Sequence, residues 1–447
     1  MKKLNSIFYN SSLLNTGLKD TFFYFVSQVG TKLVAILAIP FITRIVSPSD
    51  FANYDIFLLS NAFLSMLVSL GTDSGVAIFL IEDKENENKT AAIVSFCLSI
   101  SISLIGLLWL IAILANSNGS ITKFTGIPIN LFFLNLGATY IINFSSSFFR
   151  WKGKAKTASI IAFLGSALGV ILGFILINKY GDINSFIYGI LIGNIFALIF
   201  CIYLMKNYFV NIKIAENKNI YLELLKVSLP FIPSYLSFYL ALYLDRFLVI
   251  QLLGTSALGL YALASRVAQI PNFGLSILTK GFQPVMLNNY QTEEGIQFNK
   301  KIYHYFLMSL LPLSLLMTVS SKLLIQIFGG NEFSSAYTLL PMISISSLIL
   351  GGMSINGFGY TIKKKSAWIF YTSILIISSN AILAFPLSNL FGVDGIALAT
   401  LIATCVGCIF YTYYSERLYS FNLSMKLTIV IYAVLISGCT LLLTQKF

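Results

Sequence analysis

Long apolar runs separated by short polar breaks occupy the chain from about residue 21 to residue 444. Most runs reach the roughly 20 apolar residues that a helix needs to cross a bilayer. They do not alternate between apolar and polar positions, as the strands of a membrane barrel would. The pattern therefore predicts membrane-spanning helices. The candidate spans cover residues 21–46, 54–80, 91–115, 128–149, 157–177, 185–206, 228–253, 258–286, 301–327, 336–362, 366–388, 394–415 and 425–444.

The composition agrees with a membrane protein. Of the 447 residues, 57% are apolar and 10% are charged, whereas a soluble domain has about 25% charged residues. Too little polar sequence remains to cover the cores of soluble domains. A soluble enzyme, a secreted disulfide scaffold and a disordered protein are therefore excluded.

Basic residues outnumber acidic ones, 29 to 17, which gives a net charge of +12. Such an excess suggests nucleic-acid binding in a soluble protein. Here most of the lysines and arginines fall in alternate loops, on the same side of the membrane as the N-terminus. Basic residues collect on cytoplasmic loops. We therefore expect a cytoplasmic N-terminus, the lipid bilayer as the surroundings, and no nucleic-acid partner.

The two halves of the chain resemble each other. Residues 149–154 (FRWKGK) correspond to residues 360–365 (YTIKKK), and Asn178–Gly181 corresponds to Asn389–Gly392. An even number of predicted spans separates the copies, so both halves cross the membrane in the same direction. We predict an all-α polytopic membrane protein with two parallel-repeat six-helix lobes, which form a 12-helix core. Its predicted parts are an N-terminal lobe at 1–206, a cytoplasmic linker at 207–227, a C-terminal lobe at 228–415 and an extra C-terminal helix at 416–447.

Glycines recur at a spacing of four in two neighbouring predicted spans. Gly165, Gly169 and Gly173 lie in one span, and Gly189 and Gly193 lie in the next. Small residues at this spacing let two membrane helices approach closely. We expect this packing to lie within one chain and the protein to be a monomer.

Five charged side chains lie deep inside predicted spans, on the first two spans of each half: Lys32, Asp73, Asp245, Arg246 and Arg266, while Lys280 lies near the cytoplasmic end of one of these spans. A charge at this depth is expensive and indicates function. The basic side chains outnumber the acidic ones, and arginine matches the geometry of phosphate oxygens. A pocket lined by Lys32, Arg246 and Arg266 would therefore bind an anion. Two roles stay open for Asp73 and Asp245, namely ion coupling and pairing with a basic residue of the other lobe.

Polar side chains surround these charges. Tyr235, Tyr239 and Arg246 are four and seven residues apart, which places them on one helix face. Arg266 and Gln269 are three residues apart and share a face of the next span. We expect these faces to line a polar cavity.

Motifs for catalysis are absent from the sequence. It has no Walker A motif, and no predicted loop is long enough to form a catalytic domain with paired carboxylates. Cys405 and Cys408 form a C-x-x-C within a predicted span, but no second pair accompanies them. Such cysteines are typical packing residues. We therefore expect a protein that is not an enzyme and that binds no cofactor and no metal.

Three stretches resemble a known family. Residues 40–51 (PFITRIVSPSDF) are similar to the opening stretch of the bacterial polysaccharide transporter, or O-antigen flippase, family. This family belongs to the multidrug/oligosaccharidyl-lipid/polysaccharide exporter superfamily. Residues 229–233 (LPFIP) with Asp245 and Arg246 resemble the family's seventh helix, and residues 253–261 follow the family pattern after it. The resemblance extends over essentially the whole chain.

The resemblance implies a V-shaped bundle with a cationic central cavity in the bacterial cytoplasmic membrane. It implies export of undecaprenyl-pyrophosphate-linked oligosaccharide from the cytoplasmic to the outer leaflet by alternating access. Lys32, Arg246 and Arg266 would then hold the pyrophosphate, and the sugar would lie beside Tyr235 and Tyr239. A glycan polymerase and chain-length machinery are candidate partners of such a flippase.

Three alternatives stay open. A drug or cation antiporter of the same superfamily would depend on a carboxylate rather than on the arginines. A flippase for a peptidoglycan precursor would be essential to the cell. A membrane glycosyltransferase or glycan polymerase would lose activity when a loop carboxylate is replaced, and the short loops argue against it.

Overall fold

The structure is a computed structural model of the chain. It describes residues 30, 33–82, 87–116, 127–209, 214–229, 231–288, 290–363, 365 and 367–444. The chain folds into two compact units, each described separately below. The N-terminal unit extends to Val46 and resumes over Ile56–Ile232, and the C-terminal unit holds Ser47–Asp55 and everything from Pro233 onward.

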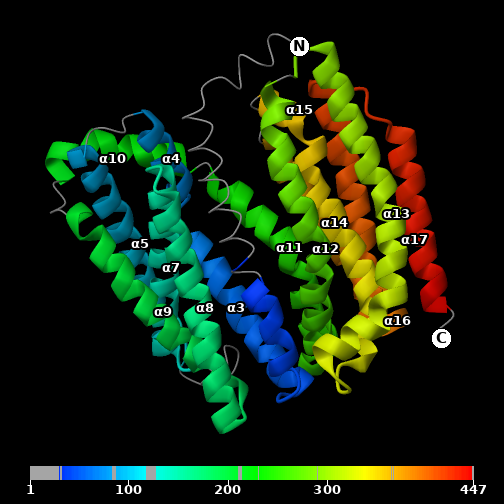
Figure 1. The fold of residues 1–447 in the computed structure, drawn as a ribbon, viewed down its shortest axis with the longest axis horizontal. Coiled ribbons are helices and arrows are strands. Elements are labelled where there is room, and N and C mark those ends of the chain that lie inside the picture. Colours follow the sequence, from blue (N-terminus) through cyan, green and yellow to red (C-terminus); the bar gives the residue numbers. More distant parts are fainter. Residues whose placement is uncertain are drawn as a thin grey trace. The chain divides into compact units, whose positions relative to one another are not determined.

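The described part of the N-terminal unit consists of helices joined by short turns. They are α3 (Pro48–Ser69), of which the part after Asp55 belongs here, α4 (Thr72–Glu82), α5 (Glu87–Ala115), α7 (Ile129–Trp151), α8 (Ala155–Tyr180), α9 (Ile183–Met205), the short 3-10 helix η1 (Lys206–Tyr208) and α10 (Ile214–Ser228) (Figure 1). A helix without a label runs over Leu33–Ile42. Helix α10 lies in the segment predicted as a linker and packs on α4 and α5, where Tyr221 stacks on Phe96 at 4.2 Å between ring centroids.

The C-terminal unit is also built from helices in its described part. They are α11 (Phe231–Leu253), of which the part from Pro233 belongs here, α12 (Thr255–Asn288), α13 (Glu293–Gly329), η2 (Ser334–Thr338), α14 (Leu339–Asn356), α15 (Phe358–Ile362), α16 (Ala367–Leu418) and α17 (Met425–Thr444) (Figure 1). Helix α14 packs against α12, α13 and α16, so it forms the centre of the unit. A hydrogen bond of 2.8 Å between Tyr303 and Thr428 joins α13 to α17.

Ten helices in the described residues are long and apolar enough to cross a membrane. The chain is therefore an all-α, multi-pass membrane protein, as the hydrophobic pattern predicted. The predicted span 21–46 lies mostly outside the described residues. Predicted span 258–286 is helix α12, which is not among the ten and which carries Arg266, Gln269 and Asn272.

The prediction of one uninterrupted span at 54–80 was wrong. Leu70 and Gly71 adopt positive φ angles of 50° and 69°, which end α3 and separate it from α4. The carbonyl groups freed by this break find side-chain donors, because the Thr72 hydroxyl donates to Ser69 O at 2.6 Å and the Ser101 hydroxyl donates to Val68 O at 2.7 Å. Satisfied backbone groups make an interrupted helix tolerable inside a membrane.

The break predicted between spans 366–388 and 394–415 is confirmed. Helix α16 runs through both, but Gly392 has a φ of 58° and a ψ of −131°, which interrupts the helix there. Its repeat counterpart, Gly181, ends α8 with a φ of 76°. An aspartate follows each glycine: Asp182 caps α9, and Asp394 accepts a hydrogen bond from the Thr338 hydroxyl at 2.6 Å. The two halves thus share a turn as well as a sequence pattern.

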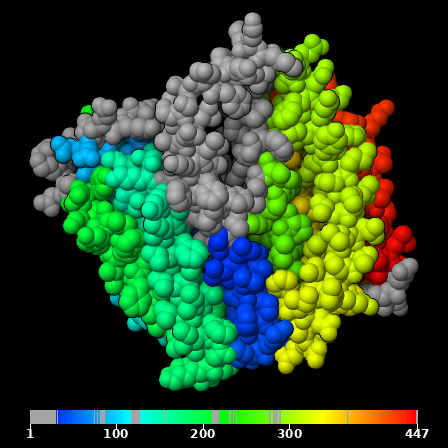
Figure 2. Space-filling view, viewed as in Figure 1, coloured from blue at the N-terminus to red at the C-terminus, as the bar shows by residue number. Residues whose placement is uncertain are grey.

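The predicted packing of glycines within one chain is confirmed in the N-terminal unit. A Cβ atom added at Gly189 would clash with the backbone of Gly173, and one added at Gly193 would clash with the backbone of Gly169. The helices α8 and α9 therefore touch backbone to backbone. Helix α8, which is turquoise in Figure 2, also carries exposed apolar side chains suited to lipid, such as Ile171 and Ile175.

Replacing Gly193 with valine is expected to destabilise the protein by about 1–3 kcal/mol, because the added methyl groups must push α9 away from α8. The thermal unfolding midpoint of the purified protein in detergent measures this loss. Gly106→Ala is the matched control, since a Cβ there meets nothing within 4 Å and alanine favours a helix. An equal midpoint for Gly193→Val and wild type would contradict the account.

Candidate functional site

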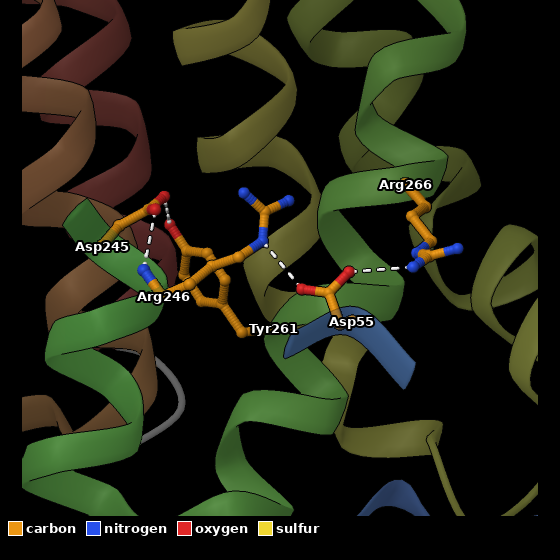
Figure 3. A network of polar contacts seen from close by, with 5 residues as sticks. All are labelled: Asp55, Asp245, Arg246, Tyr261 and Arg266. Carbon is orange, nitrogen blue, oxygen red and sulfur yellow. Dashed lines mark hydrogen bonds and ion pairs between the residues drawn. The ribbon is translucent and has the colours of Figure 1, made fainter. Parts of the chain in front are cut away.

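A cluster of charged residues is buried in the C-terminal unit. Asp55 lies on the first turns of α3, Arg246 on α11 and Arg266 on α12 (Figure 3). The Arg246 Nε lies 3.1 Å from Asp55 Oδ2, and the Arg266 Nη2 donates to Asp55 Oδ1 at 2.9 Å. One carboxylate is therefore shared between two guanidinium groups.

Apolar contacts hold the first turns of α3 in this unit. Phe51 is fully buried and packs edge-on against Phe333, with 5.7 Å between the ring centroids. Gly259 of α12 lets the Pro48 carbonyl approach closely, and a Cβ at this position would clash with it. These contacts place Asp55 beside α11 and α12.

Burial makes the shared carboxylate energetically important. The side chains of Asp55, Arg246 and Arg266 are only 4%, 8% and 17% exposed. A buried charge costs several kcal/mol unless a partner compensates it. Asp55 is thus the ion-pair partner of two positive charges, and the negative charge of Asp245 also acts on Arg246 without a contact between their side chains.

Asp245 does not pair with an arginine side chain. Its carboxylate accepts a hydrogen bond from the backbone N–H of Arg246 at 2.8 Å and a second, at 2.5 Å, from the hydroxyl of the fully buried Tyr261. Figure 3 shows it directed toward Tyr261 and away from Asp55. Asp245 thus anchors the backbone of α11 to α12 next to Arg246.

Aromatic rings flank both guanidinium groups. Arg266 lies over the rings of Phe51 and Tyr54, at 5.1 Å and 4.6 Å from their centroids, and Arg246 lies 5.2 Å from the ring centroid of Tyr243. Such contacts contribute about 0.5–2 kcal/mol each. They keep the two arginines in place without neutralising their charge.

The terminal nitrogens of Arg246 are directed away from Asp55 (Figure 3). In the described part of the chain, the only protein oxygen in ion-pair contact with this guanidinium is Asp55 Oδ2, which faces its Nε. The two terminal NH₂ groups present a planar pair of donors. Such a pair matches two oxygens of a phosphate or carboxylate group.

The structure brings together some of the residues predicted from sequence. Arg246 and Arg266 meet through Asp55, and Tyr239 packs on Tyr243 at 5.5 Å between ring centroids, next to Arg246. Tyr235, which is 36% exposed, lies three turns before Arg246 on α11, and Gln269 is exposed one turn after Arg266 on α12.

The structure does not place two predicted residues relative to this cluster. Asp73 lies on the first turn of α4 in the N-terminal unit, where its Oδ1 has no hydrogen-bond partner among the described residues. Lys32 lies outside the described residues. Their parts in an anion pocket or in ion coupling stay predictions.

The sequence analysis did not single out Asp55, although it carries both ion pairs. It occupies the second position of the predicted span 54–80, and a charge at the end of a span is expected at the membrane surface rather than in a buried site. The internal repeat gave no signal for it, because aligning the first residues of α3 and α12, Pro48 and Thr255, places Asp55 opposite Ala262 and not opposite Arg266.

The cysteines are free thiols in the structure. Cys405 and Cys408 are buried in α16, and Cys408 lies 3.4 Å from the Tyr432 hydroxyl. In the described residues, no group of three or more His, Cys, Asp or Glu side chains is placed to hold a metal ion.

Replacing Tyr261 with phenylalanine is expected to destabilise the protein by about 1–3 kcal/mol, because buried Asp245 loses a hydrogen-bond donor. Urea or thermal unfolding of the purified protein measures the change. Tyr371→Phe, at a 55% exposed position of α16, is the control and should leave stability unchanged. Equal stability of both variants would show that the Tyr261–Asp245 contact does not hold α11 to α12.

Comparison with known proteins identifies the family to which this chain belongs. The family profile described as "Polysaccharide biosynthesis protein" matches residues 18–290. The capsular polysaccharide biosynthesis protein CapF of Staphylococcus aureus is 24% identical over 90% of this chain and 100% of its own length. The multidrug export protein MepA of Staphylococcus aureus (strain NCTC 8325 / PS 47) is 28% identical over 66% of this chain and 67% of its own.

Among solved structures, the lipid II flippase MurJ in an inward closed conformation superposes with a TM-score of 0.66 at 17% identity. The match covers 96% of this chain and 93% of MurJ. The likeness confirms the predicted fold of the multidrug/oligosaccharidyl-lipid/polysaccharide exporter superfamily. With more than half of its length matched by the family profile, the chain belongs to the polysaccharide biosynthesis protein family.

Proposed function

We propose that this protein is a flippase for undecaprenyl-pyrophosphate-linked oligosaccharide of the O-antigen or capsule type. It would carry the lipid-linked repeat unit from the cytoplasmic leaflet of the bacterial inner membrane to the outer leaflet by alternating access. The observation that carries this proposal is the pair Arg246 and Arg266, which share a single carboxylate inside a member of this family. Transport rather than catalysis is the proposed activity.

The anionic linker of the cargo fits the arginine pair. A pyrophosphate offers several oxygens to the terminal nitrogens of Arg246 and can compete with Asp55 for Arg266. Hydrogen bonds between two charged groups are short and roughly twice as strong as neutral ones. Asp55 pairs with the arginines when cargo is absent, and the pyrophosphate pairs with them when cargo is bound. The buried guanidinium groups therefore have a negatively charged partner in both states. Asp55 thereby becomes the resting counter-ion of the pair.

The remaining predicted residues take supporting roles in the proposal. Lys32 would add a third positive charge to the site that binds the pyrophosphate. Tyr235, Tyr239 and Gln269 would contact the sugar, since tyrosine rings combine an apolar face with a hydroxyl group. Asp73 and Asp245 would couple transport to an ion. The N-terminus would be cytoplasmic, and a glycan polymerase with chain-length machinery would receive the cargo.

A drug or cation antiporter is the second candidate, and the similarity to MepA favours it. It would use a carboxylate such as Asp73 or Asp245 to bind its cation. A peptidoglycan-precursor flippase is a less favoured candidate, because the likeness to MurJ concerns the fold.

Deletion of the gene tests the proposed function in cells. The proposal predicts loss of surface polysaccharide together with accumulation of lipid-linked oligosaccharide in the cytoplasmic leaflet. Normal surface glycan with increased sensitivity to cationic drugs would support the antiporter instead. Complementation with the wild-type gene is the control for effects on neighbouring genes.

A further inference from the structure

A basic pocket lies where α13 and α17 begin, at one end of the C-terminal unit. Its volume is about 410 Å³. Helix α13 contributes a row of polar side chains, and the start of α17 closes the other side. The side chains that matter here are Gln297, Lys300, Lys301 and His304 of α13, with Ser424 and Leu427 beside α17.

The pocket carries uncompensated positive charge. Lys300 and Lys301 are exposed, and neither forms an ion pair within 4 Å in the described part of the chain. Glu416, the acidic residue before the loop that leads to Ser424, is used elsewhere. Its carboxylate accepts hydrogen bonds from the backbone N–H groups of Phe421 and Leu423 at 3.0 and 3.2 Å.

The position along α13 places the pocket at a membrane boundary. Residues 302–321 contain no Lys, Arg, Asp or Glu. At 1.5 Å per residue they span about 30 Å, the thickness of the hydrocarbon core. Lys300 and Lys301 therefore lie at the level of the lipid headgroups, and Lys322 lies near the opposite boundary.

Apolar surface continues from the pocket toward the membrane centre. On α13, Tyr305 is 68% exposed and Met308 is 44% exposed. On the neighbouring helix α17, Ile429, Val430 and Val434 are each about half exposed. A ligand seated in the pocket would thus have a charged end at the lysines and an apolar end along two packed helices.

We propose that this pocket binds an anionic glycerophospholipid. The headgroup phosphate pairs with Lys300 and Lys301, and the acyl chains lie along the exposed apolar side chains of α13 and α17. Juxtamembrane lysines attract anionic lipids, and the apolar surface distinguishes a lipid from a free phosphate. The site is separate from the Asp55–Arg246–Arg266 cluster and does not depend on what the protein transports.

Titration of the full-length purified protein in neutral detergent tests the proposal, with fluorescently labelled phosphatidylglycerol as the probe and labelled phosphatidylcholine as its neutral counterpart. Wild type should bind phosphatidylglycerol at least tenfold more tightly than phosphatidylcholine. The double variant Lys300→Gln, Lys301→Gln should weaken phosphatidylglycerol binding about 10–30-fold, at about one factor of five per lysine, and leave phosphatidylcholine unchanged. The matched control, Lys154→Gln with Lys156→Gln, changes two exposed lysines at the start of α8 and should have no effect.

Three results would overturn the proposal. Equal affinity of wild type for the two lipids would remove the headgroup selectivity, and unchanged binding in the Lys300 and Lys301 variant would remove the site. Displacement of the labelled lipid by glycerol phosphate at similar concentrations would show that the acyl chains contribute nothing. Since no cargo is present in this assay, its outcome is independent of the transport assays.

Discussion

The double variant Arg246→Ala, Arg266→Ala is expected to reduce export of lipid-linked oligosaccharide by at least about 100-fold. Each arginine that loses its charge-assisted contact with the linker removes about 1.5–3 kcal/mol, and each 1.4 kcal/mol is a factor of ten. Surface polysaccharide in a complemented deletion strain measures the effect. The Arg→Lys variants should keep part of the export, because lysine retains the charge but loses the planar fork.

Arg417→Ala is the matched control for this prediction. Arg417 is an exposed arginine of the same unit, and it also lies over a tyrosine ring, 4.9 Å from the centroid of Tyr413. Its loss should leave export near the wild-type level. Full export by the Arg246 and Arg266 double variant, at normal abundance in the membrane, would rule out binding of the cargo's pyrophosphate by these two arginines.

Asp55→Asn is expected to destabilise the protein by about 3–5 kcal/mol, because two buried guanidinium groups lose their shared counter-ion. Inorganic pyrophosphate should then restore much of the loss. A ligand that binds only the folded state stabilises it by mass action, and in this variant no carboxylate competes for the arginines. The expected result is a larger rise in unfolding temperature with pyrophosphate for Asp55→Asn than for wild type.

Two further variants make this result interpretable. Asp182→Asn removes a carboxylate at the start of α9, where asparagine caps a helix equally well, so it should change neither stability nor the response to pyrophosphate. Asp55→Glu keeps the charge and provides a folded protein if Asp55→Asn does not accumulate. A smaller pyrophosphate response in Asp55→Asn than in wild type would mean that Asp55 assists anion binding instead of competing with it.

The hydrophobic pattern was sufficient to predict the class of fold and most of the helices, because a bilayer demands long apolar helices whatever their packing. The glycine spacing in α8 and α9 was equally informative, since only small residues permit backbone contact. The break at Leu70 was missed for a physical reason. One of its freed carbonyl groups accepts a hydrogen bond from Ser101 of another helix, and such a long-range partner leaves no local pattern.

The candidate site was predicted in part. Arg246 and Arg266 stand out in sequence because a charge inside an apolar run has to be explained, and the structure joins them. Asp55 did not stand out, since it lies near the end of a run, where a charge needs no partner. Its burial follows from the packing of Phe51 on Phe333, and residues so far apart in sequence show no spacing that predicts this contact.

The most direct test of the central claim is translocation in reconstituted vesicles. Purified protein would be inserted into liposomes that contain a fluorescent undecaprenyl-pyrophosphate-linked oligosaccharide, and a membrane-impermeant quencher would report the fraction on each leaflet. The account predicts that wild type exchanges the lipid between leaflets, that the Arg246 and Arg266 double variant does not, and that Arg417→Ala does. Exchange by wild type and the double variant at the same rate, or transport of a cationic drug by a protein that leaves the lipid in place, would contradict it.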